Sequence, residues 1–423
     1  MRLELPYGTD RCKADLDWGR LLGVLDIADA PALDLPEAAL AQAIEAPIGL
    51  DGDPFARFRP GQTVAIVVSD SFRKTRIELL LPTLLDRLDQ AGIVPQDICF
   101  VYATGSHRPP TDAEQAVILG QAAYDAFRGQ AYAHDPRDTA NLVHMGTTSR
   151  DTPVWLNRRV VEADHVIVTG AVVMHYFGGF GGGRKAILPG ISGLETISHN
   201  HAMNLDPIED RINPDVRIGV LDGNPVAEDM LEGARMLPVD LLVNTVLDRH
   251  GAIAGVFVGE LEAAHREACA FARKLYAVPI AEQADLVIAA SGPTRNFVQT
   301  HKALYNAYQA VKPDGRIVLV ARCEEGLGGE QFQKWLRLGN RAAIIAGLRR
   351  ESEINGQTAL STIQKSPITA FVTDLSEAEV TLLGGRKAPS LEAALGEVRG
   401  ALGPDPTIYV MPSAAYTVPM VGK

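Results

Sequence analysis

The residues with the most distinctive chemistry lie together near the middle of the chain. Residues 174–204 contain one histidine (His175), a cluster of glycines, one lysine (Lys185) and a histidine pair, His199 and His201. The glycines are Gly178, Gly179, Gly181, Gly182 and Gly183. Histidine titrates near neutral pH and binds metals, and a lysine beside a glycine loop can contact phosphate or hold a group covalently. The stretch therefore predicts a ligand site.

A strand and a helix are expected on the two sides of this loop. Residues 165–173 are apolar and β-branched, which predicts a buried strand, and residues 193–203 read as the start of a helix. Strand, glycine-rich loop and helix is the order that α/β proteins use to bind phosphorylated ligands. So many glycines so close together suggest that the backbone approaches a ligand closely.

Two features limit the chemistry of this stretch. The spacing from Gly178 to Gly183 matches a P-loop, but Ala186 follows the lysine where the magnesium-binding hydroxyl would be needed, so hydrolysis of a nucleoside triphosphate is disfavoured. His199 and His201 are two residues apart, so on a helix their side chains diverge by about 200°. At most one of them is expected to bind a metal there.

Two earlier predicted strands also end in polar residues. Asp70 closes the first, with Arg73 just beyond it, and His107 follows the second. Because ligands bind at the carboxyl ends of parallel strands, these residues and His175 are expected to face one crevice. Two histidines there suggest acid–base catalysis, and the arginine suggests a fork for a carboxylate.

Alternation of strands with helices predicts two α/β domains with mostly parallel sheets. We expect an N-terminal cofactor-binding domain over residues 1–280 and a smaller C-terminal domain over residues 281–407. The expected strands are 63–70, 98–104, 165–173, 239–247, 252–258, 284–290, 316–321, 369–373 and 407–411. In the second domain, Tyr308 and Lys312 are expected on one face of a helix, since they are four residues apart.

The totals exclude several classes of protein. The chain has 423 residues, of which 46% are hydrophobic, and a formal net charge of −12. This acidic balance argues against a nucleic-acid or membrane-surface partner. The four cysteines contain no CxxC pair, and there is no signal peptide or membrane-length apolar run. We therefore expect reduced cysteines and a cytoplasmic location.

Together these residues resemble the lactate racemase family, the nickel-pincer-nucleotide-dependent 2-hydroxy acid racemases and epimerases. The resemblance spans most of the chain, in the order that the family has. The motifs that carry it are Ser69–Arg73, Ala103–Pro109, His175–Gly190, Glu195–His201, Leu221–Val226 and Tyr308–Lys312.

The resemblance implies a role for each motif. Lys185 would hold the cofactor covalently, and His201 would be the protein ligand of its nickel. The cofactor is the nickel-pincer nucleotide, pyridinium-3,5-bisthiocarboxylic acid mononucleotide nickel. His107 and His175 would be the acid–base pair. Asp70, Gly181, Gly182 and Gly183 would help to bind the cofactor, and Arg73, Tyr308, Gln309 and Lys312 would bind the substrate.

The implied activity is inversion of C2 of a 2-hydroxy carboxylic acid by proton-coupled hydride transfer through a 2-keto acid. The implied architecture places the active site in an interdomain cleft and returns the tail, residues 408–423, to the first domain. Cofactor-synthesis proteins are the implied partners. The bulky, basic segment 71–76 and Phe177 depart from the pattern expected for a lactate-sized ligand, so lactate is only one candidate substrate.

Two other hypotheses remain open from the residues. One is a non-catalytic binder of the nickel-pincer cofactor, and the other is a phosphate- or nucleotide-binding enzyme that uses the glycine loop without nickel. Nickel content distinguishes the phosphate- or nucleotide-binding enzyme from the racemase and the cofactor binder, because it alone uses no nickel. Stereochemical turnover separates an isomerase from a carrier.

Overall fold

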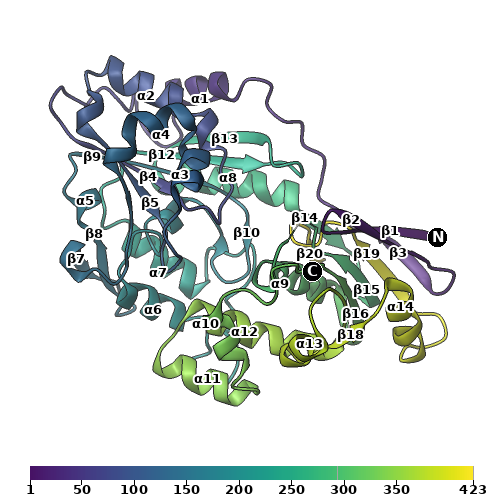
Figure 1. Ribbon diagram of the computed structural model, residues 1–423. Coiled ribbons are helices and arrows are strands. Elements are labelled where there is room, and N and C mark those ends of the chain that lie inside the picture. Colours follow the sequence, from purple (N-terminus) through teal and green to yellow (C-terminus); the bar gives the residue numbers. More distant parts are fainter. Residues whose placement is uncertain (293, 423) are drawn as a thin grey trace. The chain divides into compact units, whose positions relative to one another are not determined.

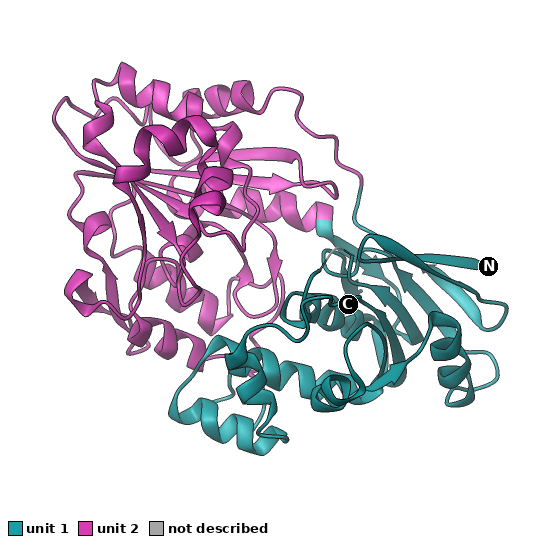
Figure 2. Cartoon of the chain, in the orientation of Figure 1, with its two compact units in different colours: residues 1–28, 205–211, 276–423 teal, residues 29–204, 212–275 magenta. Residues whose placement is uncertain are grey.

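The computed structural model describes residues 1–292 and 294–422 (Figure 1). The chain forms two compact units, which Figure 2 shows in different colours. Unit 1 comprises residues 1–28, 205–211 and 276–423, and unit 2 comprises residues 29–204 and 212–275. Both units are therefore built from segments that are discontinuous in sequence.

Unit 2 contains a six-stranded sheet in the order β13-β12-β9-β4-β5-β6, in which β13 pairs antiparallel to β12 and the other neighbours are parallel. The predicted strands of this unit are confirmed, and the short strand β6 was not predicted. The strands are β4 (Val64–Ser69), β5 (Ile98–Ala103), β6 (Ala131–Ala133), β9 (His165–Ala171), β12 (Leu241–Leu247) and β13 (Ile253–Gly259).

The two faces of this sheet are both buried, because successive residues of a strand point to opposite sides. In β4, Ile66 and Val68 face one core, whereas Ala65 and Val67 face the other, and all four are fully buried. Each valine or isoleucine buried in this way stabilises the fold by roughly 1.5–3 kcal/mol. The first core is covered by α1 (Pro36–Glu45), α2 (Leu81–Gln90), α3 (Asp112–Leu119) and α4 (Gln121–Phe127). The second is covered by α5 (Arg158–Val161), α7 (Pro225–Ala234) and α8 (Leu261–Tyr276).

Shorter elements complete unit 2. Helix α3 begins with a capping box, since Thr111 caps it and pairs reciprocally with Glu114. The remaining helix is α6 (Leu194–Ala202), and the remaining strands are β7 (Leu142–Thr147), β8 (Pro153–Asn157), β10 (Met174–His175) and β11 (Gly179–Phe180). The 3-10 turns are η1 (Ile77–Leu79), η2 (Pro95–Asp97), η3 (Arg128–Gln130), η4 (Thr139–Asn141) and η5 (Gly183–Ala186).

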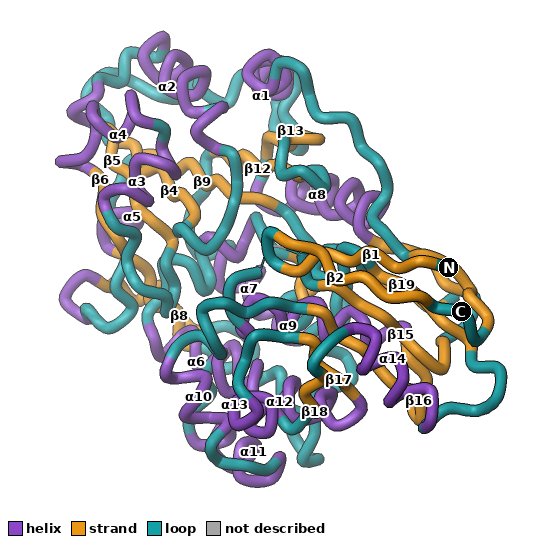
Figure 3. The backbone as a smooth tube through the Cα atoms, turned by 45° about the vertical axis from the view of Figure 1, so that its right-hand side comes forward, coloured by secondary structure: helices purple, strands orange, loops and turns teal. Residues whose placement is uncertain are grey.

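Unit 1 contains a second six-stranded sheet, parallel throughout, in the order β18-β17-β16-β15-β19-β3. Its strands are β3 (Arg20–Val24), β15 (Ala284–Ala290), β16 (Val311–Val320), β17 (Thr369–Val372), β18 (Arg386–Ala388) and β19 (Thr407–Met411). Figure 3 shows the strands of each unit with helices beside them. The mixed α/β class with mostly parallel sheets is thus as predicted.

The hairpin of β1 (Arg2–Tyr7) and β2 (Asp10–Asp15) and helix α14 (Leu391–Gly400) cover one face of this sheet. Helix α9 (Phe297–Ala310) lies against β15 and β16. The remaining elements are α10 (Glu330–Leu336), α11 (Arg341–Arg350), α12 (Ile354–Lys365), η6 (Ser366–Ile368), α13 (Glu377–Leu383), β14 (Ala277–Ile280) and β20 (Val418–Val421).

Besides residues 205–211, which lie in unit 1 and not with the rest of the predicted N-terminal domain, the units differ from the predicted domains in two respects. Residues 1–28 lie in unit 1, because β3 adds to the edge of its sheet by pairing with β19. The tail 408–423 also lies in unit 1, where β19 pairs with β15 and β20 pairs with β14. Main-chain pairing with a partner distant in sequence decides both placements, and hydrophobic periodicity carries no information about it.

In the part of the chain that the structure describes, no helix combines the length and the apolar character that crossing a bilayer requires. All four cysteines are free thiols: Cys12, Cys99, Cys269 and Cys323.

Candidate active site

Three neighbouring strands of unit 2 carry the polar residues predicted at strand ends. Strands β9, β4 and β5 are adjacent and parallel, so the segments that follow them leave from the same edge of the sheet. Asp70 follows β4, His107 lies in the loop after β5, and His175 lies in β10, shortly after β9. The topology therefore brings these segments to one edge, as the sequence predicted.

Asp70 and His107 are in direct contact. His107 Nδ1 lies 2.6 Å from Asp70 Oδ2, and Asp70 Oδ1 accepts the backbone N–H of Phe72 at 3.1 Å. Both carboxylate oxygens of the buried Asp70 thus have protein partners. A carboxylate only accepts, so Nδ1 is the protonated nitrogen and, in the neutral ring, Nε2 of His107 holds the lone pair. Asp70 orients His107, a role that the sequence reading had not given it.

His175 has the opposite hydrogen-bond pattern. Its Nδ1 accepts the backbone N–H groups of Phe177 and Gly178, at 3.4 and 3.3 Å. In the neutral ring the proton is therefore on Nε2. The two candidate histidines thus present different groups at Nε2, a lone pair at His107 and an N–H at His175.

Arg73 is an exposed cation beside this pair. Its backbone N–H bonds to Asp70 O at 3.2 Å, and its guanidinium donates to Phe72 O at 3.2 Å. It forms no ion pair with any residue in the described ranges 1–292 and 294–422. The charge of Arg73 is therefore available to an acidic ligand.

Lys185 and His201 both lie close to the Phe177 ring. Lys185 Nζ is 4.7 Å from the centroid of this ring, and the His201 ring centroid is 4.9 Å from it. Burial, and then the positive charge of Lys185, lower the pKa of His201 to about 3. A neutral imidazole is the form that binds a metal. This pair suits a cofactor that is anchored at the amine and carries its own metal.

The two histidines of α6 separate as their helical spacing predicted. His201 is buried, whereas His199 is exposed. Within the described residues there is no group of three or more His, Cys, Asp or Glu side chains able to hold a metal. A site that offers one histidine fits a metal whose other ligands come from a cofactor.

Several N–H groups of the glycine loop are already bonded within the protein. The backbone N–H of Gly181 donates to Val173 O at 2.8 Å, that of Gly183 to Asn244 Oδ1 at 2.9 Å, and that of Lys185 to Gly182 O at 3.0 Å. These groups are unavailable to a phosphate. The close approach that the glycines permit is to the protein itself, since a Cβ on any of the five would meet protein atoms within 3.5 Å.

The predicted substrate residues of unit 1 lie in different surroundings. Helix α9 ends at Ala310, so Tyr308 is helical but Lys312 lies in β16; the shared helical face is wrong. Pro313 disfavours helical geometry at the residue before it. Lys312 Nζ pairs with Asp285 Oδ1 at 2.9 Å, and Gln309 Nε2 donates to Tyr305 O at 3.4 Å.

A buried polar cluster beside Tyr308 was not predicted. Lys365 Nζ donates to Ser361 Oγ at 2.8 Å and lies 5.2 Å from the Tyr308 ring centroid. His301 Nε2 is 2.9 Å from the same hydroxyl. In α12, Ser361 and Lys365 stand four residues apart, a spacing that indicates only a shared helix face.

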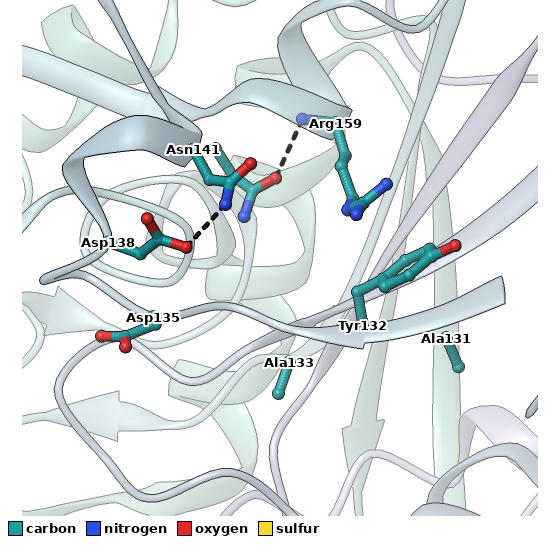
Figure 4. A pocket seen from close by; sticks show the side chains of 8 residues that line it. Ala131, Tyr132, Ala133, Asp135, Asp138, Asn141 and Arg159 are labelled. Carbon is teal, nitrogen blue, oxygen red and sulfur yellow. Dashed lines mark hydrogen bonds between the residues drawn. The ribbon is translucent and has the colours of Figure 1, made fainter. Parts of the chain in front are cut away.

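The structure also contains a cavity of about 300 Å³ along the edge strand β6 (Figure 4). Arg159 stacks over the Tyr132 ring there at 3.8 Å, and Asn141 donates to Asp138. None of the residues predicted to act on a ligand lines this cavity. We therefore place the candidate active site at the strand ends and the glycine loop.

Two known domain families match most of the chain. The lactate racemase N-terminal domain family matches residues 7–211, and the lactate racemase C-terminal domain family matches residues 280–418. Lactate racemase from Thermoanaerobacterium thermosaccharolyticum is 31% identical over 341 residues, which cover 79% of this chain and 78% of that protein. Lactate racemase from Lactiplantibacillus plantarum is 31% identical over 339 residues, or 78% and 77% of the two chains.

Solved structures give the same result. The lactate racemase apoprotein of Thermoanaerobacterium thermosaccharolyticum superposes with a TM-score of 0.88 at 28% identity, covering 99% of this chain and 100% of that one. A protein from Thermotoga maritima shares the fold alone, with a TM-score of 0.67 at 16% identity over 94% and 100% of the chains. Its similarity to these racemases makes the chain an α/β isomerase. The chain belongs to the lactate racemase family.

Proposed function

We propose that this protein inverts the configuration at C2 of a small 2-hydroxy carboxylic acid, with a nickel-pincer nucleotide held on Lys185. Lactate is one candidate substrate. The observation that carries the proposal is the 2.6 Å contact between Asp70 and His107, at the same sheet edge as His175. A carrier that performs no chemistry has no need of an oriented histidine.

Membership of the family implies a nickel-dependent cofactor. Lys185 and His201, both close to the Phe177 ring, fit its anchor and its metal ligand. When bound, the cofactor supplies a carbon that accepts a hydride from C2 and returns it. The N–H groups of Gly181, Gly183 and Lys185, which are bonded within the protein, weigh against the alternative of a phosphate-binding enzyme without nickel.

The proton steps follow from the two hydrogen-bond patterns. His107 Nε2, with its lone pair, takes the hydroxyl proton of one enantiomer as C2 loses its hydride and the substrate becomes a 2-keto acid. Asp70 stabilises the imidazolium that results. For return of hydride to the opposite face, His175 donates to the ketone oxygen from Nε2 and completes the inverted hydroxyl group. The two histidines exchange roles in the reverse direction.

Binding and orientation fall to the cations. Arg73, which lacks an acidic partner among the described side chains, holds the substrate carboxylate through its planar fork. Gln309 and Tyr308 are proposed as further substrate contacts. Lys312 is already paired with Asp285, so it can bind the substrate only by leaving or sharing this carboxylate.

The cofactor proposal is tested by intact mass and nickel content after co-expression with cofactor-synthesis proteins. The wild type should carry a covalent adduct and about one nickel per chain. Lys185→Ala should lose the adduct, and His201→Ala should lose nickel. His199→Ala is the matched control, because His199 is exposed on the same helix and should change neither. An unmodified, nickel-free wild type, with the pathway verified on another family member, would refute the proposal.

The acid–base proposal is tested with enantiopure 2-hydroxy acids and chiral chromatography. His107→Ala should keep the adduct but lower kcat by roughly 100-fold or more, and Asp70→Asn should lower kcat by roughly 100-fold with little change in KM. The exposed His250 gives a control, His250→Ala, which should racemise like the wild type. Wild-type turnover by Asp70→Asn would remove the assigned role of Asp70.

A further inference from the structure

Side chains from three later parts of unit 2 hold the glycine loop, residues 178–183. They are His265 of α8, Asn244 of β12 and Asn224, which caps α7. Arg184, the residue before the anchor lysine, turns inward among them and is buried. None of these four side chains has a role in the chemistry proposed above.

His265 bonds the loop through one nitrogen and Arg184 through the other. Its Nε2 lies 2.9 Å from Gly181 O, so this nitrogen carries the proton. Its Nδ1 lies 3.4 Å from a guanidinium nitrogen of Arg184, which can only donate. Burial, and then the charge of Arg184, lower the pKa of His265 to about 3. The ring is therefore a neutral donor to the loop.

The other bonds fix both ends of the loop. Asn244 Oδ1 accepts the N–H of Gly183 at 2.9 Å, and Asn224 Nδ2 donates to Phe177 O at 2.9 Å. Arg184 donates to Gly178 O at 2.6 Å. The Asn244 bond satisfies a buried N–H, and loss of such a partner costs about 1–3 kcal/mol, whereas Gly178 O also accepts the N–H of Phe180 at 2.8 Å.

The loop and these side chains are complementary in shape. Gly183 has φ +51°, and a Cβ there would lie 2.5 Å from the His265 ring. Gly182 has φ +70°, and a Cβ there would lie 2.9 Å from Asn244 Oδ1. L side chains rarely adopt these angles, so glycine is required both by the backbone and by the neighbouring side chains. The side chains of His265 and Asn244 therefore leave room only for glycine at positions 182 and 183.

We infer that His265, Asn244 and Arg184, which we call the loop clamp, are positioning residues that set where Lys185 presents its amine. The 3-10 turn η5, which carries Lys185, begins at Gly183, the residue held by Asn244 and packed against His265. Release of the clamp therefore displaces Lys185 without altering any group that reacts. The inference rests on the proposed function in taking Lys185 as the cofactor anchor.

The test compares two substitutions at one position. Gln has a donor at its end and an acceptor beside it, so His265→Gln can keep both bonds of the imidazole, whereas His265→Phe fills the space but removes both. The first readout uses the cofactor-free chain. The acetylation rate of Lys185 is measured by peptide mass mapping against the exposed Lys274, at a temperature where circular dichroism shows each variant folded.

We expect His265→Phe to raise the relative acetylation rate of Lys185 at least threefold, and His265→Gln to stay within twofold of the wild type. The second readout is the fraction of chains that carry the adduct after co-expression. It should fall at least fivefold in His265→Phe and recover in His265→Gln. Asn244→Ala should act in the same direction as His265→Phe.

Two results would overturn the inference. One is a folded His265→Phe protein whose Lys185 reacts at the wild-type rate. The other is equal loss in the Gln and Phe variants, which would show that keeping the two hydrogen bonds does not keep Lys185 in place. A wild type without adduct refutes the proposed cofactor instead, and the acetylation rates still decide whether the clamp positions Lys185.

Discussion

Each unit buries one cation without an acidic partner, and the two cations behave differently. Arg184 in unit 2 is 2% exposed and Lys365 in unit 1 is 4% exposed. Each lies near a buried histidine, His265 and His301. Neither forms an ion pair with any residue that the structure describes. A buried charge without a counter-ion is expensive, so each site needs another source of stabilisation.

The difference lies in the acceptors. Arg184 donates to two carbonyl oxygens, Gly178 O and Ala227 O, and faces an imidazole nitrogen. Burial lowers the pKa of Arg184 only to about 10, so it stays charged at neutral pH. Among the described residues Lys365 bonds only to Ser361, close to the rings of two tyrosines, and burial lowers its pKa to about 7. Arg184 is thus a permanent charge, and Lys365 is a titrating one.

Removal of Arg184 should have the largest effect. Arg184→Met removes two charge-assisted hydrogen bonds, to Gly178 O and Ala227 O, and a hydrogen bond to a charged group contributes about 1.5–3 kcal/mol. We expect the free energy of unfolding to fall by roughly 2–6 kcal/mol, measured by urea denaturation at pH 7. A loss below about 1 kcal/mol would mean that other groups replace Arg184 as the donor. The proposed difference between Arg184 and Lys365 would then be wrong.

Replacement of Lys365 should instead change how stability depends on pH. The amine has a pKa of about 7 in the folded chain and 10.5 as its ordinary value. Between these values the unfolded chain binds the extra proton, so the stability of the wild type rises with pH by about 1.4 kcal/mol per unit. Below pH 7 both states are protonated and the slope disappears. Lys365→Met lacks this group.

The measured quantity is the free energy of unfolding of the wild type minus that of Lys365→Met. We expect this difference to be flat below pH 7 and to rise by roughly 3 kcal/mol from pH 7.5 to 9.5. Other titrating groups cancel in the subtraction. A flat difference across the whole range would show that the Lys365 amine keeps its ordinary pKa, and that both cations are permanent.

The sequence predicted what depends on local pattern. The buried strands, the polar residues at the ends of β4 and β5, and the opposite exposure of His199 and His201 all follow from periodicity or spacing. Membership of the family rests on motifs that are contiguous in the chain. Asp70 and His107 were predicted to share a crevice, but their direct contact was not.

What the sequence did not predict depends on contacts between distant segments. Arg184 reads as a second basic residue beside Lys185, and only residues 224–265, folded back on the loop, make it a buried donor. Helical spacing placed Lys312 beside Tyr308, but the pairing of β16 with β15 takes residue 311 and its successors into the sheet. Strand pairing likewise places the tail in unit 1, since β19 pairs with β15 and β20 pairs with β14.

The substitution with the smallest expected effect, Arg184→Lys, tests whether the acceptors of Arg184, and not its burial, make it differ from Lys365. Arg184→Lys keeps a cation, but an ammonium lacks the fork that reaches Gly178 O and Ala227 O together. Loss of one such bond should lower the free energy of unfolding by about 1–3 kcal/mol at pH 7. A lysine buried here should also titrate as Lys365 does, so this deficit should shrink as the pH rises to 9.5. Urea denaturation at both pH values measures the change. A deficit that stays constant would show that the surroundings of residue 184 hold any cation charged, and that the guanidinium fork is not the reason that Arg184 differs from Lys365.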